Sequence, residues 1–131
     1  MGKVQESIQF YEKAYAYAPR ENLIKLEYAS ALITAKTSIN KAIGLLEQIL
    51  EEDKQDINVW QQLSIAYGQK NDKANSNIAL GWVALLKGDI PAAKRMAALS
   101  EKEIKSDSPA NLRNKLEDLK IAIQGIEFDE A

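Results

Sequence analysis

The side chains that could perform chemistry in this sequence are carboxylates, lysines and serines, because the chain has no histidine and no cysteine. Thiol catalysis, disulfides and thiolate metal sites are therefore excluded. An enzyme would need a serine–lysine pair or a carboxylate pair, and no such pair stands out in the sequence. We therefore expect no catalytic residue in this chain and no enzyme activity.

Carboxylates gather in two places where they could bind a cation: Glu51, Glu52 and Asp53, and then Glu101, Glu103 and Asp107. Neither group has the D-x-[DN]-x-[DN]-G spacing of a calcium loop. Acidic runs of this kind usually face solvent on a helix surface. The sequence therefore predicts no metal site and no cofactor.

Two tryptophans, Trp60 and Trp82, could stack on a ligand. Tryptophan at a helical core position serves packing much more often than ligand binding. For Trp60 the spacing of its neighbours favours packing. Trp82 is kept as a candidate binding residue, for the reason given below.

Composition indicates one soluble, globular and helix-favouring domain of 131 residues, with 46% hydrophobic and 27% charged residues and only 3 prolines. The 17 basic and 19 acidic side chains are scattered, so no basic stripe is available to follow a phosphate backbone. Nucleic acid is therefore not an expected partner. No apolar run reaches the roughly 18 residues of a membrane span, so membrane insertion is not expected either.

A period of 35 residues runs through the first half of the chain. The segment 59–67 places Trp60, Leu63, Ser64 and Tyr67 on one helical face, where the short Ser64 would allow a neighbouring helix to approach. Equivalent helix positions recur 35 residues apart. The pairs are positions 7 and 42, 11 and 46, 14 and 49, and 25 and 60. The period predicts stacked helix pairs.

Apolar periodicity and capping signals predict seven helices, over residues 4–18, 22–36, 39–50, 57–70, 73–87, 90–104 and 108–126. Thr37 with Ser38, then Asp56 and Asp89, are expected helix caps, and Gly88 is an expected left-handed helix end. Residues 127–131 are expected to form a frayed acidic tail. The expected fold is a single all-α domain, an α-α superhelix of about seven antiparallel helices ending in a capping helix.

The face of Trp60, Leu63, Ser64 and Tyr67 resembles the W-x2-L-G-x2-Y signature of the tetratricopeptide repeat, with Ser64 in place of glycine. One period earlier, Lys25 stands where the tryptophan would be. The resemblance implies a half repeat at 4–19, repeats at 20–54 and 56–88, an overlapping repeat at 73–105, and a capping helix at 108–126. Residues 73–87 would then serve two units, and Met1 and Gly2 would be an expression start inside a longer protein.

Tetratricopeptide arrays bind partners in a concave groove lined by the first helix of each unit. The resemblance therefore implies a groove for a peptide or protein segment. Its expected residues are Leu26, Ser30, Ile33, Gln61, Ile65, Gln69, Ile78 and Trp82. Ile33, Ile65 and Trp82 would be apolar anchors, and Gln61 and Gln69 would bond to the ligand backbone. The alternative is that these residues pack against the last helix or against a missing domain.

Roughly the last 70 residues, with W-Q-Q-L-S-I-A-Y-G and A-L-G-W-V-A-L-L-K-G-D, also resemble the C-terminal repeats of periplasmic zinc metalloproteases of the barrel-assembly-enhancing type. In that family a catalytic H-E-x-x-H helix precedes the repeats, and this chain has no histidine. The resemblance implies a periplasmic location and a role in holding a substrate or partner, or the missing N-terminal domain. Without it, a cytoplasmic location is the expectation. A homodimer through the exposed half repeat is a third hypothesis.

Overall fold

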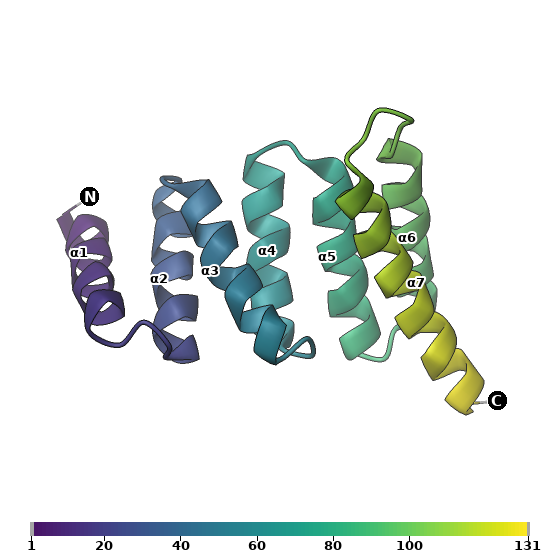
Figure 1. Cartoon of the computed structure of the whole chain (residues 1–131), viewed down its shortest axis with the longest axis horizontal. Helices are drawn as coiled ribbons and strands as arrows, with labels where there is room; N and C mark the ends of the chain where they lie inside the picture. Colours follow the sequence, from purple (N-terminus) through teal and green to yellow (C-terminus); the bar gives the residue numbers. More distant parts are fainter. Residues whose placement is uncertain (1, 131) are drawn as a thin grey trace.

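The computed structural model describes residues 2–130, which form seven α-helices joined by short turns (Figure 1). The helices are α1 (Gly2–Tyr17), α2 (Asn22–Ala35), α3 (Ile39–Glu52), α4 (Ile57–Gln69), α5 (Lys73–Leu86), α6 (Ile90–Glu103) and α7 (Ala110–Glu130). No strand occurs within the described range. The expected all-α superhelix of seven helices is confirmed.

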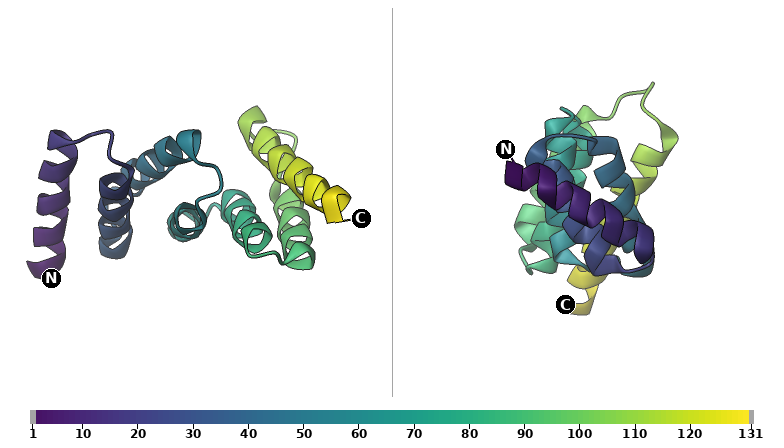
Figure 2. Two further views of the ribbon diagram at one scale, coloured as in Figure 1. Left: turned by 90° about the horizontal axis from the view of Figure 1, so that it is seen from below. Right: turned by 90° about the vertical axis from the view of Figure 1, so that its left-hand side faces the viewer.

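Each helix packs against the next one along the chain, so the helices form a row from the N-terminus to the C-terminus (Figure 1). In the view from below, α4, α5 and α6 lie along one side, whereas α3 and α7 lie on the opposite side (Figure 2). Helix α3 packs on α4, and α7 packs on both α5 and α6. No backbone contact joins α3 to α7 within residues 2–130, so these two helices do not pack directly on each other.

Short-range chemistry explains where several helices begin and end. Asp56, Asp72 and Asp89 cap α4, α5 and α6, because a carboxylate oxygen of each accepts a hydrogen bond from a backbone N–H of the first helical turn. Gly88 lies between α5 and α6 with φ +83°, where glycine has no steric cost. These observations confirm Asp56, Asp89 and Gly88 as helix boundaries.

The turn between α2 and α3 differs from expectation. Ser38 is the residue before α3, but its side chain makes no capping hydrogen bond, because its backbone is left-handed at φ 50°. Lys36 is also left-handed at φ 56°, and its backbone N–H bonds to Ile33 and Leu32 carbonyl groups. Two left-handed residues therefore reverse the chain where side-chain capping by Thr37 and Ser38 was expected.

The core consists of two hydrophobic clusters that share α5. The N-terminal cluster is built from α1 to α4 together with Ala79 of α5, and its fully buried members include Tyr28, Leu46 and Leu63. The C-terminal cluster is built from Ala74, Ile78 and Leu85 of α5 with residues of α6 and α7, and its fully buried members include Leu119. Because α5 contributes to both clusters, it connects the two halves of the protein.

Small residues mark the closest approaches between helices. The Ser76 hydroxyl of α5 donates a hydrogen bond to the Ser64 carbonyl oxygen of α4 at 3.0 Å, which requires the two backbones to lie close together. A Cβ atom added to Gly81 would lie only 2.5 Å from Cδ2 of Leu119. Ser76 and Gly81 therefore permit the packing of α5 against α4 and α7.

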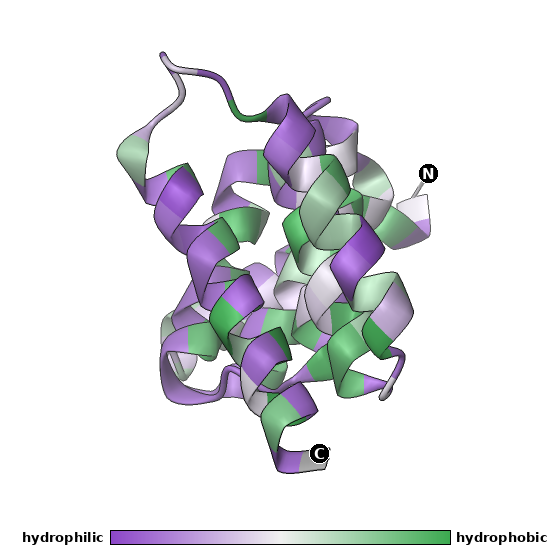
Figure 3. Cartoon of the chain, turned by 90° about the vertical axis from the view of Figure 1, so that its right-hand side faces the viewer, coloured by the Kyte–Doolittle hydropathy of each residue, from purple (hydrophilic) through white to green (hydrophobic). Residues whose placement is uncertain are grey.

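The expected frayed tail of residues 127–131 is corrected by the structure, since α7 continues without a break to Glu130 and Ala131 lies outside the described residues. The Lys94 ammonium of α6 pairs with the Glu127 carboxylate at 2.6 Å and holds this end of the helix. Hydrophobic and hydrophilic residues alternate along α7 when it is seen from the C-terminal side (Figure 3). In the described part of the chain, no helix combines the length and the hydrophobicity that crossing a bilayer requires.

Candidate functional site

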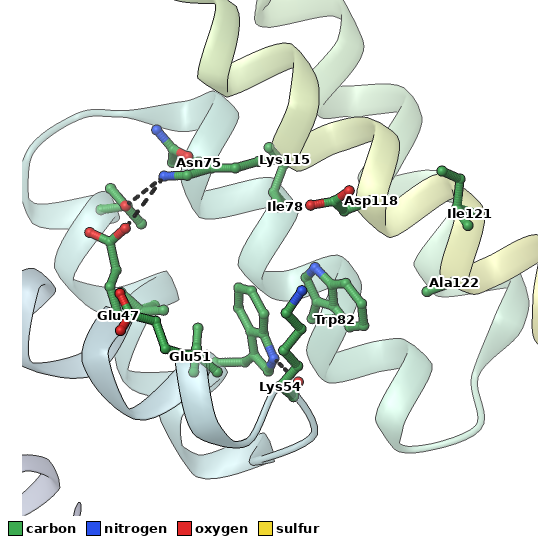
Figure 4. A pocket seen from close by; sticks show the side chains of 14 residues that line it. Glu47, Glu51, Lys54, Asn75, Ile78, Trp82, Lys115, Asp118, Ile121 and Ala122 are labelled. Carbon is green, nitrogen blue, oxygen red and sulfur yellow. Dashed lines mark hydrogen bonds and ion pairs between the residues drawn. The ribbon is translucent and has the colours of Figure 1, made fainter.

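The candidate functional site is a cavity of about 390 Å³ between α3 and α7, with its floor on α4 and α5 (Figure 4). Its size falls within the range of roughly 300–1,000 Å³ that is typical of ligand pockets. Four helices provide the lining: Glu47, Leu50 and Glu51 of α3 with Lys54 beyond it; Trp60, Leu63 and Tyr67 of α4; Asn75, Ile78 and Trp82 of α5; and Lys115, Asp118, Ile121 and Ala122 of α7.

Two stacked tryptophans form part of the floor. The rings of Trp60 and Trp82 are 5.2 Å apart between centroids and only 8° from parallel. The indole N–H of Trp60 donates a hydrogen bond to the Lys54 carbonyl oxygen at 2.8 Å, which fixes the orientation of that ring. Both side chains are half-buried, so the stack contributes to packing and also presents aromatic surface to the cavity.

Lys115 of α7 connects the two walls at one end of the cavity. Its ammonium group lies 3.8 Å from the Glu47 carboxylate of α3. It also donates a hydrogen bond to the Tyr67 hydroxyl at 3.4 Å and lies 5.6 Å from the centre of that ring. These contacts cross the gap between α3 and α7, which have no backbone contact in the described residues.

The Tyr67 phenol has a pKa raised above its ordinary value of 10.0, first by burial and then by the negative charges of Glu47 and Asp72. Lys115 is the cation that faces it. The unfolded chain would ionise this tyrosine at a lower pH than the folded chain does. Its contribution to stability is therefore complete below pH ~10 and is lost as the pH rises above that value.

Between neutral pH and pH ~11, the free energy of unfolding should fall less in the Tyr67→Phe variant than in the wild-type protein, because phenylalanine cannot ionise. Urea denaturation at both pH values measures this difference. Tyrosinate absorbance during an alkaline titration should show one fewer late-titrating group in the variant. Equal losses of stability in the two proteins would contradict this account of Tyr67.

Four charged groups other than Lys115 border the cavity: Glu47, Glu51, Lys54 and Asp118. Glu47 is paired with Lys115, whereas Glu51 and Asp118 have no ion pair among residues 2–130. Figure 4 shows Glu47 and Glu51 on one side of the cavity and Asp118 on the other. The rim therefore presents a carboxylate without an ion pair on each wall, together with Lys54, which has no ion pair within the described residues, above a largely apolar floor.

Only two of the eight expected groove residues, Ile78 and Trp82, border the cavity. Leu26, Ser30 and Gln61 are half-buried elsewhere, and Ile65 is 48% exposed on α4 outside the cavity. The groove residues predicted from the repeat register therefore do not coincide with the residues that line the cavity. The structure does not bring the eight residues together in one hollow.

Ile33 and Gln69 require a correction. Ile33 is 3% exposed inside the N-terminal cluster, so a ligand cannot reach it as an apolar anchor. The Gln69 side-chain amide donates a hydrogen bond to the Ile33 carbonyl oxygen at 3.0 Å and joins α4 to the end of α2. This N–H is used inside the protein because α2 and α4 pack against each other, and Oε1 of Gln69 is buried, so the side chain does not face a ligand backbone.

The residues that sequence reasoning missed come mainly from α3 and α7. Glu51 was assigned to a solvent-facing acidic run, and the predicted capping helix includes Lys115, Asp118 and Ile121. Glu47 was not singled out. The two tryptophans were the signal in the sequence that could have indicated the cavity. They were assigned separately, Trp60 to packing and Trp82 to a binding surface. Their stacking shows that both belong to one site.

Neither acidic cluster forms a metal-binding arrangement in the described residues. No group of three or more histidine, cysteine, aspartate or glutamate side chains with the geometry to hold a metal ion occurs within residues 2–130. Glu51 borders the cavity, but Glu52 instead accepts a hydrogen bond from the Asn22 side chain at 2.8 Å. The acidic run 51–53 therefore divides between the cavity rim and a contact with α2.

Comparison with known proteins identifies no relative, since no protein-family model, no curated protein and no solved structure matches the chain. Its function must be inferred from the helices and from the cavity between them.

Proposed function

We propose that the chain is a non-catalytic protein-interaction scaffold that binds a segment of another protein in the cavity above Trp60 and Trp82. The observation that carries this proposal is the stacked tryptophan pair, which borders an open hollow instead of being enclosed in the core. Binding sites on proteins commonly combine aromatic anchors in a central pocket with a polar rim. The apolar floor and the charged walls have this arrangement.

The arrangement of the helices supports membership of the tetratricopeptide-repeat class as part of the proposal. Helix α4 begins 35 residues after α2 (57 minus 22), which is the period found in the sequence. Helices α2 and α3, and then α4 and α5, are consecutive packed helices joined by short turns. Such repeats act mainly by presenting a surface to another polypeptide.

The proposal is tested by selecting peptides from a random displayed library against the wild-type protein and measuring their affinities for surface variants. Ile121→Glu places a charge at the cavity edge on a side chain that is 58% exposed, so the fold should survive. We expect the dissociation constant of the selected peptides to rise at least about tenfold, because a carboxylate would lose its hydration inside the complex. Fluorescence of the two tryptophans, both of which border the cavity, reports binding directly.

Ile65→Glu is the matched control, since Ile65 is similarly exposed, at 48%, but lies outside the cavity. Affinity for the selected peptides should be unchanged in this variant. The reverse result, with Ile65→Glu impaired and Ile121→Glu normal, would place binding on the surface that the repeat register predicts. That outcome would refute the cavity as the binding site.

A second candidate function is that of the partner-holding C-terminal domain of a larger periplasmic zinc metalloprotease. The observation that favours it is α5, which contributes to both hydrophobic clusters, as the double use of residues 73–87 in that resemblance requires. Catalysis would then lie outside this chain. Reading the gene upstream of Met1 tests the idea, because an H-E-x-x-H helix supports it and its absence removes it.

A further inference from the structure

The cavity lies between two helices that do not pack directly on each other. Helices α3 and α7 lie on the same side of the α4–α5–α6 row and on either side of the cavity (Figure 2). They have no backbone contact with each other in the described residues, and only the Lys115 side chain spans the distance between them. Helices that pack directly have axes about 8–10 Å apart, so α3 and α7 do not pack on each other, and the cavity of about 390 Å³ between them can receive side chains of an occupant.

The walls of the cavity favour an occupant that satisfies its own backbone hydrogen bonds. All of the walls are helical or close to a helix end, and their backbone groups are already bonded within the helices. The Trp60 indole N–H is bonded to the Lys54 carbonyl, and the Tyr67 hydroxyl accepts a hydrogen bond from Lys115. An extended peptide would find few partners for its N–H and C=O groups, whereas a helix needs none.

The charges on the rim specify the flanks of that occupant. Glu51 on α3 and Asp118 on α7 lie on opposite walls and have no ion pair within residues 2–130 (Figure 4). Lys54 also lines the cavity, where Figure 4 shows its side chain reaching toward Trp82, so the charges outside the Lys115–Glu47 pair are two carboxylates and one ammonium group. Basic side chains on both flanks of a bound segment would be attracted to these walls.

We infer that the occupant is an amphipathic α-helix of a partner protein, whose apolar face covers the Trp60–Trp82 stack and whose two flanks carry lysine or arginine. This inference rests on the proposed function of the same cavity and names the class of partner. The apolar side chains of the bound helix enter the cavity between α3 and α7, beside the Lys115 side chain that crosses it. Its basic residues face Glu51 on one wall and Asp118 on the other.

Three synthetic peptides of 14 residues, the length of α3, test the inference. The first has leucines along one helical face and lysines on both flanks, the second has glutamates in place of the lysines, and the third carries two central prolines in the lysine peptide. Tryptophan fluorescence measures affinity for the wild-type protein and for the double variant Glu51→Lys/Asp118→Lys, and circular dichroism measures helix formation. Both substituted residues are exposed, so the variant should fold.

We expect the lysine peptide to bind the wild-type protein about tenfold or more tightly than the glutamate peptide does, and to gain helix on binding. The double variant should reverse this preference. The proline peptide should bind at least about tenfold more weakly, because proline prevents helix formation. A preference that reverses in the variant cannot arise from general hydrophobic attraction.

Equal binding of the proline and lysine peptides would overturn the helical occupant, while the cavity would remain a binding site. Equal binding of the lysine and glutamate peptides, or an unchanged preference in the double variant, would overturn the basic flanks. If none of the three peptides binds, although library-selected peptides bind and are weakened by Ile121→Glu, the inference is overturned and the proposed function stands. If Ile121→Glu also had no effect on the selected peptides, the proposed function would fail with it.

Discussion

Replacing Gly81 with leucine is expected to lower the free energy of unfolding by about 3 kcal/mol. A Cβ atom at this position would lie 2.5 Å from Cδ2 of Leu119 and 3.5 Å from Cβ of Met96. Leu119 is fully buried within the C-terminal cluster and cannot move aside into solvent. The added side chain would therefore push α7 away from α5, and urea denaturation measures the cost.

Gly125→Leu is the matched control, because it makes the same substitution in a helix where no atom lies within 4 Å of the added Cβ. There, the better helix propensity of leucine should leave stability unchanged or increase it by up to about 1 kcal/mol. Gly81→Leu combined with Leu119→Ala should cost less than the sum of the two single changes, since alanine opens space beside position 81. Additive costs would show that Gly81 and Leu119 do not compete for the same space.

Leu46→Ala is expected to cost about 3 kcal/mol and to act mainly on one half of the protein. Leu46 of α3 has 0% exposure and lies in the N-terminal cluster, so its removal leaves a cavity that the surrounding helices fill only in part. In a solenoid each helix contacts mainly its neighbours, so the loss should concentrate in α2, α3 and α4. Hydrogen exchange should show faster exchange in these helices than in α6 and α7.

Leu99→Ala provides the comparison for that experiment, because Leu99 lies on α6 and is 43% exposed. Its replacement should change the free energy of unfolding by no more than about 0.5 kcal/mol. If Leu46→Ala instead accelerated exchange equally in all seven helices, the two clusters would form a single cooperative unit. Helix α5 would then couple them much more strongly than its shared position suggests.

The helices themselves follow from patterns that operate within a few residues. Apolar spacing predicted all seven helices, and the ends agree with the structure to within a few residues, except that α7 continues to Glu130. Asp56, Asp89 and Gly88 were recognisable because a cap acts on the adjacent helical turn, and a left-handed glycine ends the helix beside it. The turn at Lys36 and Ser38 was harder, because neither residue is of a type that usually adopts φ > 0.

The cavity was not predictable in the same way, because it depends on how α3 and α7 are placed relative to each other in the folded chain. Periodicity shows that a helix has an apolar face, but it does not show whether a neighbour covers that face. Ile33 and Trp82 were both expected in a groove, yet Ile33 is enclosed by the N-terminal cluster and Trp82 borders a hollow.

Local sequence thus specified the helices and several of their caps, since these depend on neighbours in the chain. Tertiary structure alone placed Lys115 and Asp118 opposite Glu47 and Glu51, residues that are far apart in the sequence. It also stacked Trp82 on Trp60 instead of burying it. The physical reason is that a binding cavity is surface left uncovered by packing, and packing is decided by the whole set of helices together.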